Sequence, residues 1–467
     1  MCLIFIGAIF DPVDEVITVE NLENRTNKSM NMFYASWSDI DDAITQYLGT
    51  SEAIEAATAY IESLDGQAAV GGVDFSDLTS DSPIVTIVDT LLQQAAKMKA
   101  SDIHIEPMER KLRVRYRIDG DLYEKYTYSV KLLPSISARV KIIGGMDISE
   151  KRRPQDGRIT QQVGRQEFDI RVSILPTIYG EKIVMRLAAK NALSRDKSEL
   201  GFSPEEMKQF DHILSNPHGI LLVTGPTGSG KSTTLYTALS ELNTEDVNII
   251  TVEDPVEANI DGINQVHVNP KADLTFASAL RSILRQDPDI IMIGEIRDGE
   301  TAGIAVQASI TGHLVVSTLH TISTAATVGR LIDMGIEPYM LGDSLVGIIA
   351  QRLVRRLCEC KKARPATADE KRVLGLPATA EQTVYDPVGC QMCNNLGYKG
   401  RIGIYEIMTI NQKIRNLIAQ RATADKIKVA AEEDGMSSLR MSAAKYVCEG
   451  VTSMAELMKV TYSADES

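Results

Sequence analysis

The stretch Gly225–Ser232, with the sequence GPTGSGKS, decides the fold. It matches the complete P-loop pattern, with the apolar run Ile220–Val223 before it and the helix-compatible segment Thr233–Leu242 after it. Glycines allow backbone N–H groups to converge on phosphate oxygens, and the N-terminus of the following helix favours negative charge. The alternative is a glycine-rich turn without a ligand, which the eight-residue match and its flanks disfavour. The sequence therefore predicts an ATP site.

Two side chains of this stretch have specific expected roles. Lys231 should reach the β- and γ-phosphates, and Ser232 should ligate Mg²⁺. The residues expected to bind the nucleotide are Gly225, Pro226, Thr227, Gly228, Ser229, Gly230, Lys231, Ser232 and Thr233.

Short apolar runs alternate with longer helical or loop segments on both sides of the P-loop. Runs of this kind, without amphipathic alternation, are typical of strands in a parallel sheet that is covered on both faces. The sequence thus predicts an α/β fold. The runs are Ile220–Val223, Val247–Val252, Ile290–Ile293 and Leu314–Leu319.

Acidic residues follow two of these runs. Glu253 and Glu257 come after the second run, and Glu295 comes after the third. Ligands of open α/β sheets bind at the carboxyl ends of the strands, so Glu295 is expected to orient or deprotonate the attacking water. Each carboxylate alone would be read as a solvated loop residue, but two acidic clusters after apolar strands favour a catalytic role.

Two histidines, His313 and His320, flank the fourth run. A neutral imidazole there would sense the γ-phosphate or relay its presence across a subunit boundary. A structural role is the alternative, and the residues alone do not decide between the two.

An α+β domain is predicted before the P-loop, over residues 82–190. Ser82-Pro83 favours a helix start, and Leu112–Ile118 alternates apolar residues with arginines before the turn dipeptide Asp119-Gly120. Further strands are expected at Phe168–Val172 and Ile183–Leu187. The remaining predicted regions are an acidic N-terminal accessory region and linker over 1–81, a linker over 191–204, an ATPase core over 205–345 and a mostly helical C-terminal region over 346–467.

Four of the six cysteines lie within the segment 358–393. Cys358, Cys360, Cys390 and Cys393 offer four thiolates from two short turns, enough for a tetrahedral Zn²⁺ site. The alternative is four reduced, buried cysteines. A closed site of this kind would hold the excursion 361–389 without taking part in catalysis.

The overall charge argues against a nucleic-acid motor. The formal net charge is -14 and the pI is near 5.1, whereas proteins that grip nucleic acid present a broad cationic surface. The apolar start Met1–Phe10 is too short for a spanning helix and lacks a basic leader. We therefore expect a cytoplasmic protein with no nucleic-acid partner.

Several longer strings make a family recognisable. From about residue 82 to 463 the chain resembles the type II secretion and type IV pilus assembly ATPases. The strings that carry the resemblance are Ser101–Pro107 (SDIHIEP), Glu150–Arg158 (EKRRPQDGR), Gly180–Lys182 (GEK), Gly312-His313 and Ser317–Thr321 (STLHT).

The resemblance implies a PAS-like domain followed by a RecA-like ATPase domain, assembled as a homohexamer. It assigns Glu253–Glu257 to an acidic box, Ile290–Glu295 to a Walker B motif, and His313 and His320 to a histidine box. It also implies that Arg171 and Arg186 reach the nucleotide phosphates, a task that suits the planar, permanently charged guanidinium.

The implied machine turns a membrane-embedded platform protein and so adds pilin-like subunits to a type IV pilus or a type II secretion pseudopilus. The motor itself would work at the cytoplasmic face of the inner membrane and associate with it through partners. Three alternatives remain at this point: a competence pseudopilus motor of the same family, a RecA-like nucleic-acid translocase, and a nucleotide-gated scaffold with little turnover.

The chain departs from the family pattern in three places. Gly294 stands where many P-loop enzymes have a magnesium-binding aspartate, and Ile322-Ser323 replaces an expected polar pair. Only the tail of a family accessory domain is recognisable, at Asp11–Asp14, so cyclic dinucleotide binding is not expected to carry over.

Overall fold

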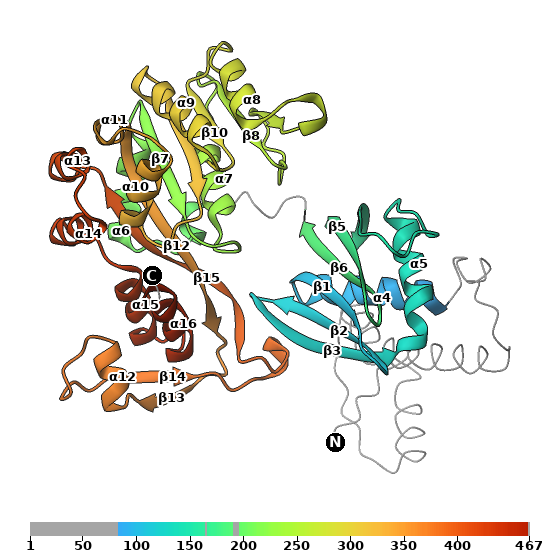
Figure 1. The fold of residues 1–467 in the computed structure, drawn as a ribbon. Coiled ribbons are helices and arrows are strands. Elements are labelled where there is room, and N and C mark those ends of the chain that lie inside the picture. The colour runs from blue at the N-terminus through green and yellow to red at the C-terminus, as the bar shows by residue number, and fades with distance from the viewer. Residues whose placement is uncertain (1–82, 164–165, 190–195, 466–467) are drawn as a thin grey trace, which may run out of the picture. The chain divides into compact units, whose positions relative to one another are not determined.

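The computed structural model describes residues 83–163, 166–189 and 196–465 (Figure 1). The chain divides into two compact units, residues 1–189 and residues 190–467. Each unit is described by itself. The predicted accessory region 1–81 and the first part of the linker 191–204 lie outside the described residues.

The described part of unit 1 is a six-stranded sheet with two α-helices. The strands run in the order β3-β2-β1-β6-β5-β4, and every neighbouring pair is antiparallel. Helices α4 and α5 pack against each other and against strands of this sheet. The elements are α4 (Pro83–Lys97), β1 (Ala100–Pro107), β2 (Lys111–Ile118), β3 (Asp121–Ser129), α5 (Leu133–Ile143), β4 (Gln155–Val163), β5 (Gln166–Thr177) and β6 (Gly180–Ala189).

The predicted local features of unit 1 are confirmed. In β2 the apolar side chains are buried and the arginines between them are partly exposed, as the alternation requires. Asp119 and Gly120 both have positive φ, 51° and 96°, which is the geometry of a tight two-residue hairpin turn. The helix α4 buries Ile84, Ile87 and Leu91 on one face.

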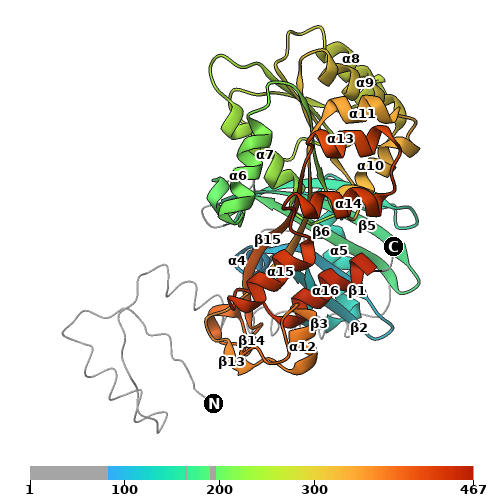
Figure 2. The same ribbon diagram turned by 90° about the vertical axis from the view of Figure 1, so that its left-hand side faces the viewer.

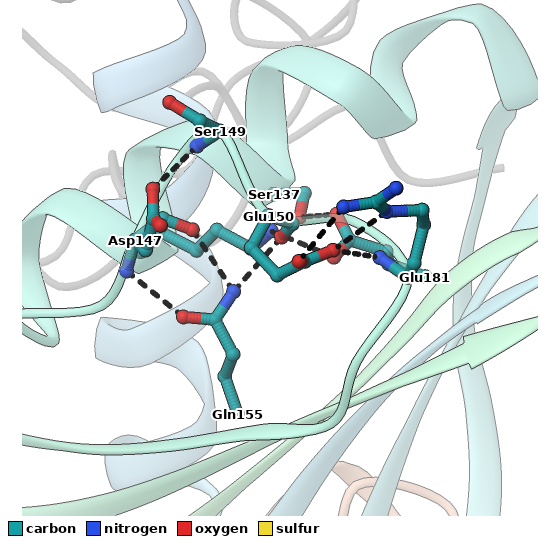
Figure 3. Close-up of polar contacts among 8 residues, drawn as sticks. Ser137, Asp147, Ser149, Glu150, Gln155 and Glu181 are labelled. Carbon is teal, nitrogen blue, oxygen red and sulfur yellow. Dashed lines mark hydrogen bonds and ion pairs between the residues drawn. The ribbon is translucent and has the colours of Figure 1, made fainter.

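A buried ion pair fixes the loop between α5 and β4 (Figure 3). Lys141 Nζ donates to Glu181 Oε1 and to the main-chain oxygen of Glu150, both at 2.7 Å. Ser137 Oγ donates to the other Glu181 oxygen at 2.6 Å. Because charged groups are costly to bury unless they are paired and hydrogen-bonded, this cluster ties the loop to one arrangement.

Unit 2 is built on a seven-stranded sheet with the order β15-β12-β7-β11-β10-β8-β9. All neighbouring strands are parallel except β12 and β15. The four predicted apolar runs form β7, β8, β10 and β11. The strands are β7 (Gly219–Thr224), β8 (Ile249–Glu253), β9 (Asn264–His267), β10 (Ile290–Ile293), β11 (Leu314–Leu319), β12 (Leu345–Leu357) and β15 (Tyr398–Thr409).

Both faces of this sheet are covered. Ile220 and Leu222 of β7 belong to one hydrophobic cluster, while Leu221 and Val223 belong to another. Helix α6 starts with the predicted cap, since Ser203 and Glu206 form a capping box around Pro204. The larger helices are α6 (Pro204–Leu214), α7 (Lys231–Leu242), α8 (Phe276–Ile283), α9 (Gly299–Ile310), α10 (Thr324–Asp333), α13 (Gln412–Ala419), α14 (Ala424–Glu433), α15 (Leu439–Cys448) and α16 (Met454–Asp465).

The prediction of a mostly helical C-terminal region is wrong. Strands β12 and β15 span 13 and 12 residues and join the same sheet as the P-loop strand, while α15 packs on β15 (Figure 2). The run Leu345–Ala350 is buried on both faces, so it carries no alternation that distinguishes a strand from a buried helix. Its parallel pairing with β7, from Leu345 opposite Ile220 to Ala350 opposite Thr224, decides the matter.

The excursion between β12 and β15 is small. It contains β13 (Lys362–Pro365), α12 (Ala368–Val373) and β14 (Thr383–Asp386). The short helix α11 (Pro338–Ser344) precedes β12. Within the described part of the chain, no helix combines the length and apolar character that crossing a membrane requires.

Candidate functional site

The P-loop lies between β7 and α7 with the backbone geometry that its glycines permit. Gly225, Gly228 and Gly230 have φ of 148°, 80° and 90°, a region that L side chains avoid. Gly230 is the N-cap of α7, and no side chain caps this end. The first N–H groups of α7 are therefore directed at the loop, as an anion site requires.

The loop packs closely on β12, which the sequence analysis did not connect to it. A Cβ added at Gly225 would lie 2.4 Å from Gln351 O, and one at Gly230 would lie 2.8 Å from Gln351 Nε2. Gln351 Oε1 also accepts a hydrogen bond from Thr234 Oγ1 at 2.8 Å. Gly225 and Gly230 thus serve close packing as well as phosphate access, and Gln351 holds the loop to the sheet.

Lys231 is folded onto its own loop. Its Nζ donates to Gly225 O at 2.7 Å and to Pro226 O at 3.1 Å, and the residue is only 8% exposed. Burial lowers the pKa of Lys231 to about 8, against the attraction of Glu295 and with some help from the charge of Arg352. Phosphate oxygens would replace the two carbonyl oxygens as acceptors for this ammonium group.

Two serines of the loop fit a bound nucleotide. Ser229 Oγ is buried and has no hydrogen-bond partner in the structure, which is costly unless a ligand supplies one. Ser232 lies exposed in the first turn of α7. The donor set suits a triphosphate with Mg²⁺, because hard oxygen donors and amide N–H groups converge there.

Glu295 meets both of its partners beyond the end of β10. It pairs with Arg297, and His320 Nε2 lies 3.2 Å from Glu295 Oε2. Burial would raise the pKa of this carboxyl, but the Arg297 hydrogen bond and charge, with a smaller effect of His320, bring it below its usual value. Because its pKa is lowered, the carboxyl is ionised at neutral pH. The side chain is 20% exposed, so it is still accessible to water.

Glu253 has a different environment at the end of β8. It is 3% exposed and accepts hydrogen bonds from Tyr236, from Thr251 Oγ1 at 2.7 Å and from Gln265 Nε2 at 3.1 Å. Glu257 is exposed on the following loop. The two predicted acidic clusters therefore differ. The carboxylate of Glu253 is buried and hydrogen-bonded, whereas that of Glu295 is accessible to water.

The two histidines lie at opposite ends of β11. His320 reaches Glu295, whereas His313 Nδ1 lies 2.9 Å from Ala308 O at the end of α9. Six strand residues at about 3.3 Å each separate them by roughly 20 Å. Of these two histidines, the structure brings His320, and not His313, to the carboxyl end of the sheet within one chain.

Hydroxyl groups that the sequence analysis did not single out link the P-loop strand to the loop after His320. Thr224 Oγ1 lies 2.6 Å from Thr321 Oγ1, which lies 2.6 Å from Thr327 Oγ1. Arg352 Nη2 donates to Ile322 O at 3.1 Å, and Ser323 caps α10. An open cavity of about 350 Å³ beside them is lined by Pro226, His320, Thr321, Ile322, Arg352, Leu353, Lys459 and Val460.

The predicted phosphate-binding arginines are neighbours in unit 1. Arg171 and Arg186 lie directly opposite each other on β5 and β6, and Arg158 lies opposite Arg171 on β4. Arg186 Nε donates to Asp102 at 3.0 Å, and Arg158 binds Asp169 through two hydrogen bonds of 2.6 Å. The guanidinium groups of Arg158 and Arg186 are therefore paired with carboxylates of the same sheet. Register places Arg158 in the row, whereas the sequence analysis recorded it only as the last residue of the string Glu150–Arg158.

The four predicted cysteines come together in unit 2. Their sulfurs all lie within 4.8 Å of one another, and the shorter separations are 3.7 to 3.9 Å. Four sulfurs at about 2.3 Å from one Zn²⁺ in a tetrahedron lie about 3.8 Å apart. The same distances are far longer than a disulfide bond of about 2.05 Å.

Backbone N–H groups surround this cluster. Cys390 and Gly397 donate to Cys393 Sγ at 3.1 and 3.3 Å, and Gly389 donates to Cys360 Sγ at 3.4 Å. Burial alone would raise the pKa of the Cys393 thiol, but the two backbone donors lower it to about 7. Burial raises the pKa of the Cys360 thiol to about 11, so of these two thiols it is Cys393 whose surroundings favour the thiolate form that a metal requires.

Comparisons with known proteins point to one family. The sequence model of the family described as "Type II/IV secretion system protein" matches residues 77–459. Type II secretion system protein E of Aeromonas hydrophila is 48% identical over 389 residues, which cover 83% of this chain and 77% of that protein. Type IV pilus assembly ATPase PilB of Myxococcus xanthus is 44% identical over 470 aligned residues, covering 97% and 81%.

Two solved structures are similar in fold. The pilus retraction motor PilT with bound ADP superposes with a TM-score of 0.55 at 26% identity, over 81% of this chain and 98% of that chain. The Legionella pneumophila ATPase DotB gives a TM-score of 0.60 at 20% identity, over 81% and 95%. The latter is a likeness of fold alone.

Proposed function

The chain belongs to the type II/IV secretion system protein family, and from that premise we propose that it is an ATPase that drives assembly of a type IV pilus or a type II secretion pseudopilus. The observation that carries this proposal is the convergence of the P-loop with Glu295 and His320 at one end of the unit 2 sheet. Relatives named as type II secretion protein E and as a pilus assembly ATPase support the same function.

The chemistry needs ATP and Mg²⁺, and Ser232 would hold the metal. Bound Mg²⁺ would neutralise developing charge on the phosphates. Lys231 would leave its two loop carbonyls and donate to the β- and γ-phosphates. Glu295, ionised and held by Arg297 and His320, would accept a hydrogen bond from the attacking water.

The nucleotide contacts are proposed as in the sequence prediction. The segment Gly225–Thr233 would surround the phosphates with its backbone N–H groups, which Pro226 alone lacks. Glu253 and Glu257 would form the acidic box, and His313 would belong to the histidine box. Arg171 and Arg186 of unit 1 would add cationic contacts to the phosphates. Their cross-strand pairing supports this role, since two adjacent guanidinium groups suit a multiply charged anion.

Zn²⁺ is the metal proposed for the cysteine site. Four sulfurs with tetrahedral spacing and no open ligand position favour a structural ion over a catalytic one. Such a site would connect the ends of the excursion 358–393, which begins after the carboxyl end of β12, and it would take no part in ATP hydrolysis at the P-loop.

The architecture proposed for the working motor has a PAS-like unit over 82–190, a RecA-like core over 205–345 and a C-terminal region over 346–467. Six chains would form a ring at the cytoplasmic face of the inner membrane. The ring would turn a membrane-embedded platform protein of the pilus or secretion machinery. The proposal rests on family membership, because a single chain contains no subunit boundary.

The decisive experiment measures phosphate release by the purified chain with ATP and Mg²⁺, with and without DNA. We expect turnover that DNA does not stimulate. Glu295→Gln should retain ATP binding and lose about 100-fold or more of kcat, the usual contribution of a general base. Strong stimulation by DNA would favour a translocase, and wild-type binding without turnover would favour a scaffold.

A further inference from the structure

The hydroxyl of Tyr236 joins the helix after the P-loop to the acidic loop after β8. Tyr236 lies in α7 and is fully buried, and its hydroxyl donates to Glu253 Oε2. The same oxygen accepts the N–H of Glu257 at 3.2 Å and that of Ala258 at 3.5 Å. One donor and two lone pairs are all that a phenol offers, so its hydrogen-bonding capacity is fully used.

The other donors to Glu253 come from the β8 and β9 side of the sheet. Thr251 lies on β8 and Gln265 lies on β9. Gln265 also bonds Ala258 O at 3.0 Å and the N–H of Ile260 at 2.9 Å, so it closes the loop onto itself. Of these three donors to Glu253, Tyr236 is the one that comes from α7, the helix that begins at Lys231.

The environment of Tyr236 keeps its proton in place. Burial, and then the hydrogen bond and charge of Glu253, raise the pKa of this phenol above its usual value. The hydroxyl therefore keeps its proton at neutral pH and donates it to Glu253. Buried polar contacts of this kind favour a single arrangement, because an unpaired partner would be costly.

We propose that Tyr236 is a positioning residue for ATP hydrolysis: it holds the carboxylate of Glu253 and the backbone at 257–258 in fixed relation to the P-loop helix. This inference rests on the proposed ATPase function. The phosphate contacts of α7 and the acidic box would then keep one relative geometry during turnover. Phosphate binding itself would not depend on the hydroxyl, since it uses the loop N–H groups and Lys231.

The test is Tyr236→Phe, which keeps the ring in the core and removes only the hydroxyl. We expect kcat to fall roughly 10- to 100-fold, the range for losing a hydrogen bond to a charged group, with KM for ATP within about threefold. In the double variant Tyr236→Phe with Glu253→Gln, kcat should be no lower than in Glu253→Gln alone, since the two residues act as one unit. The amide protons of Glu257 and Ala258 should exchange faster in Tyr236→Phe than in the wild type.

Tyr116→Phe is the matched control. Tyr116 is also fully buried, and its hydroxyl makes one hydrogen bond, to Leu91 O at 2.8 Å in unit 1. It should lower the thermal midpoint without changing kcat, which shows what the loss of a buried hydroxyl does to the fold alone.

Three outcomes overturn the inference while the ATPase function stands: normal kcat in Tyr236→Phe, additive effects of Tyr236→Phe and Glu253→Gln, or unchanged exchange at 257–258. The exchange measurement applies even if the variant is poorly active for other reasons. Absence of turnover in the wild type would overturn the proposed function, and this inference with it.

Discussion

The P-loop end of the unit 2 sheet and the cysteine-held excursion 358–393 both join distant segments, but different forces fix them. At the P-loop end, strands β7, β10 and β11 lie side by side in a sheet that is covered on both faces. The excursion has a two-stranded sheet of β13 and β14 and one short helix. Two strands alone are marginally stable in water.

The difference shows where each region obtains its precision. The sheet positions the backbone at Lys231, Glu295 and His320 through close packing on both of its faces. The excursion packs Ala366, Leu374 and Val384 into a smaller hydrophobic cluster with α15 and α16. It is further held by the four sulfurs and by Arg364, which binds Glu370 and Asp386. Substitutions at the first region should therefore change turnover, and those at the second should change local stability.

The largest expected effect is a loss of ATP binding at the P-loop end without a loss of the fold. Lys231→Ala removes two charge-assisted hydrogen bonds to phosphate of about 1.5–3 kcal/mol each, so ATP affinity should fall by at least roughly 100-fold. Calorimetric titration of ATP would measure it. The variant should remain folded, because burial already disfavours this charge; tight ATP binding by folded Lys231→Ala would refute the assigned loop.

A smaller effect, on turnover, is expected for substitution of His320 at the carboxyl end of β11. His320→Ala removes the contact with Glu295 and should lower kcat by about tenfold, equivalent to about 1.4 kcal/mol. His212 is exposed on α6 and serves as the control, since His212→Ala removes a histidine from the surface of the same unit. Equal kcat values in both variants and the wild type would show that His320 does not support the carboxylate.

The pH dependence of ATP binding tests the environment of Lys231. Its lowered pKa of about 8 means that the ammonium form, which phosphate requires, is present below pH 8 and is lost above it. ATP affinity should therefore fall roughly tenfold between pH 7 and pH 9, whereas an ordinary lysine would titrate above pH 10. Lys231→Arg should show a flat profile over this range, and a flat wild-type profile would contradict the lowered pKa.

The smallest effect on turnover is expected at the cysteines. A large effect there would contradict the contrast between the P-loop end of the sheet and the excursion. Removing Zn²⁺ with a chelator, or replacing Cys360 by Ser, should leave kcat within about twofold and speed proteolysis within 361–389 by about tenfold, or about 1.4 kcal/mol of local stability. Elemental analysis of protein purified without chelator should give about one zinc per chain. Loss of ATPase activity in step with zinc would show that the excursion reaches the catalytic site.

Local sequence patterns predicted a large part of unit 2 and of its site. The P-loop, its strand and its helix follow from glycines and apolar runs that act within about 20 residues. The capping pair Ser203 and Glu206 and the turn Asp119-Gly120 are similarly local. The four cysteines could be assigned to one metal site because their spacing is typical of metal ligands.

Only the tertiary structure decided the strands β12 and β15, the contact of Gln351 with the P-loop, and the different surroundings of Glu253 and Glu295. Each depends on residues far apart in the chain, such as Thr234 with Gln351 or Glu295 with His320. A fully buried apolar run carries no periodicity, so the sequence did not distinguish strand from helix at Leu345–Ala350. Backbone chemistry within one turn determines a P-loop, whereas the partners of a carboxylate are determined by which strands become neighbours in the sheet.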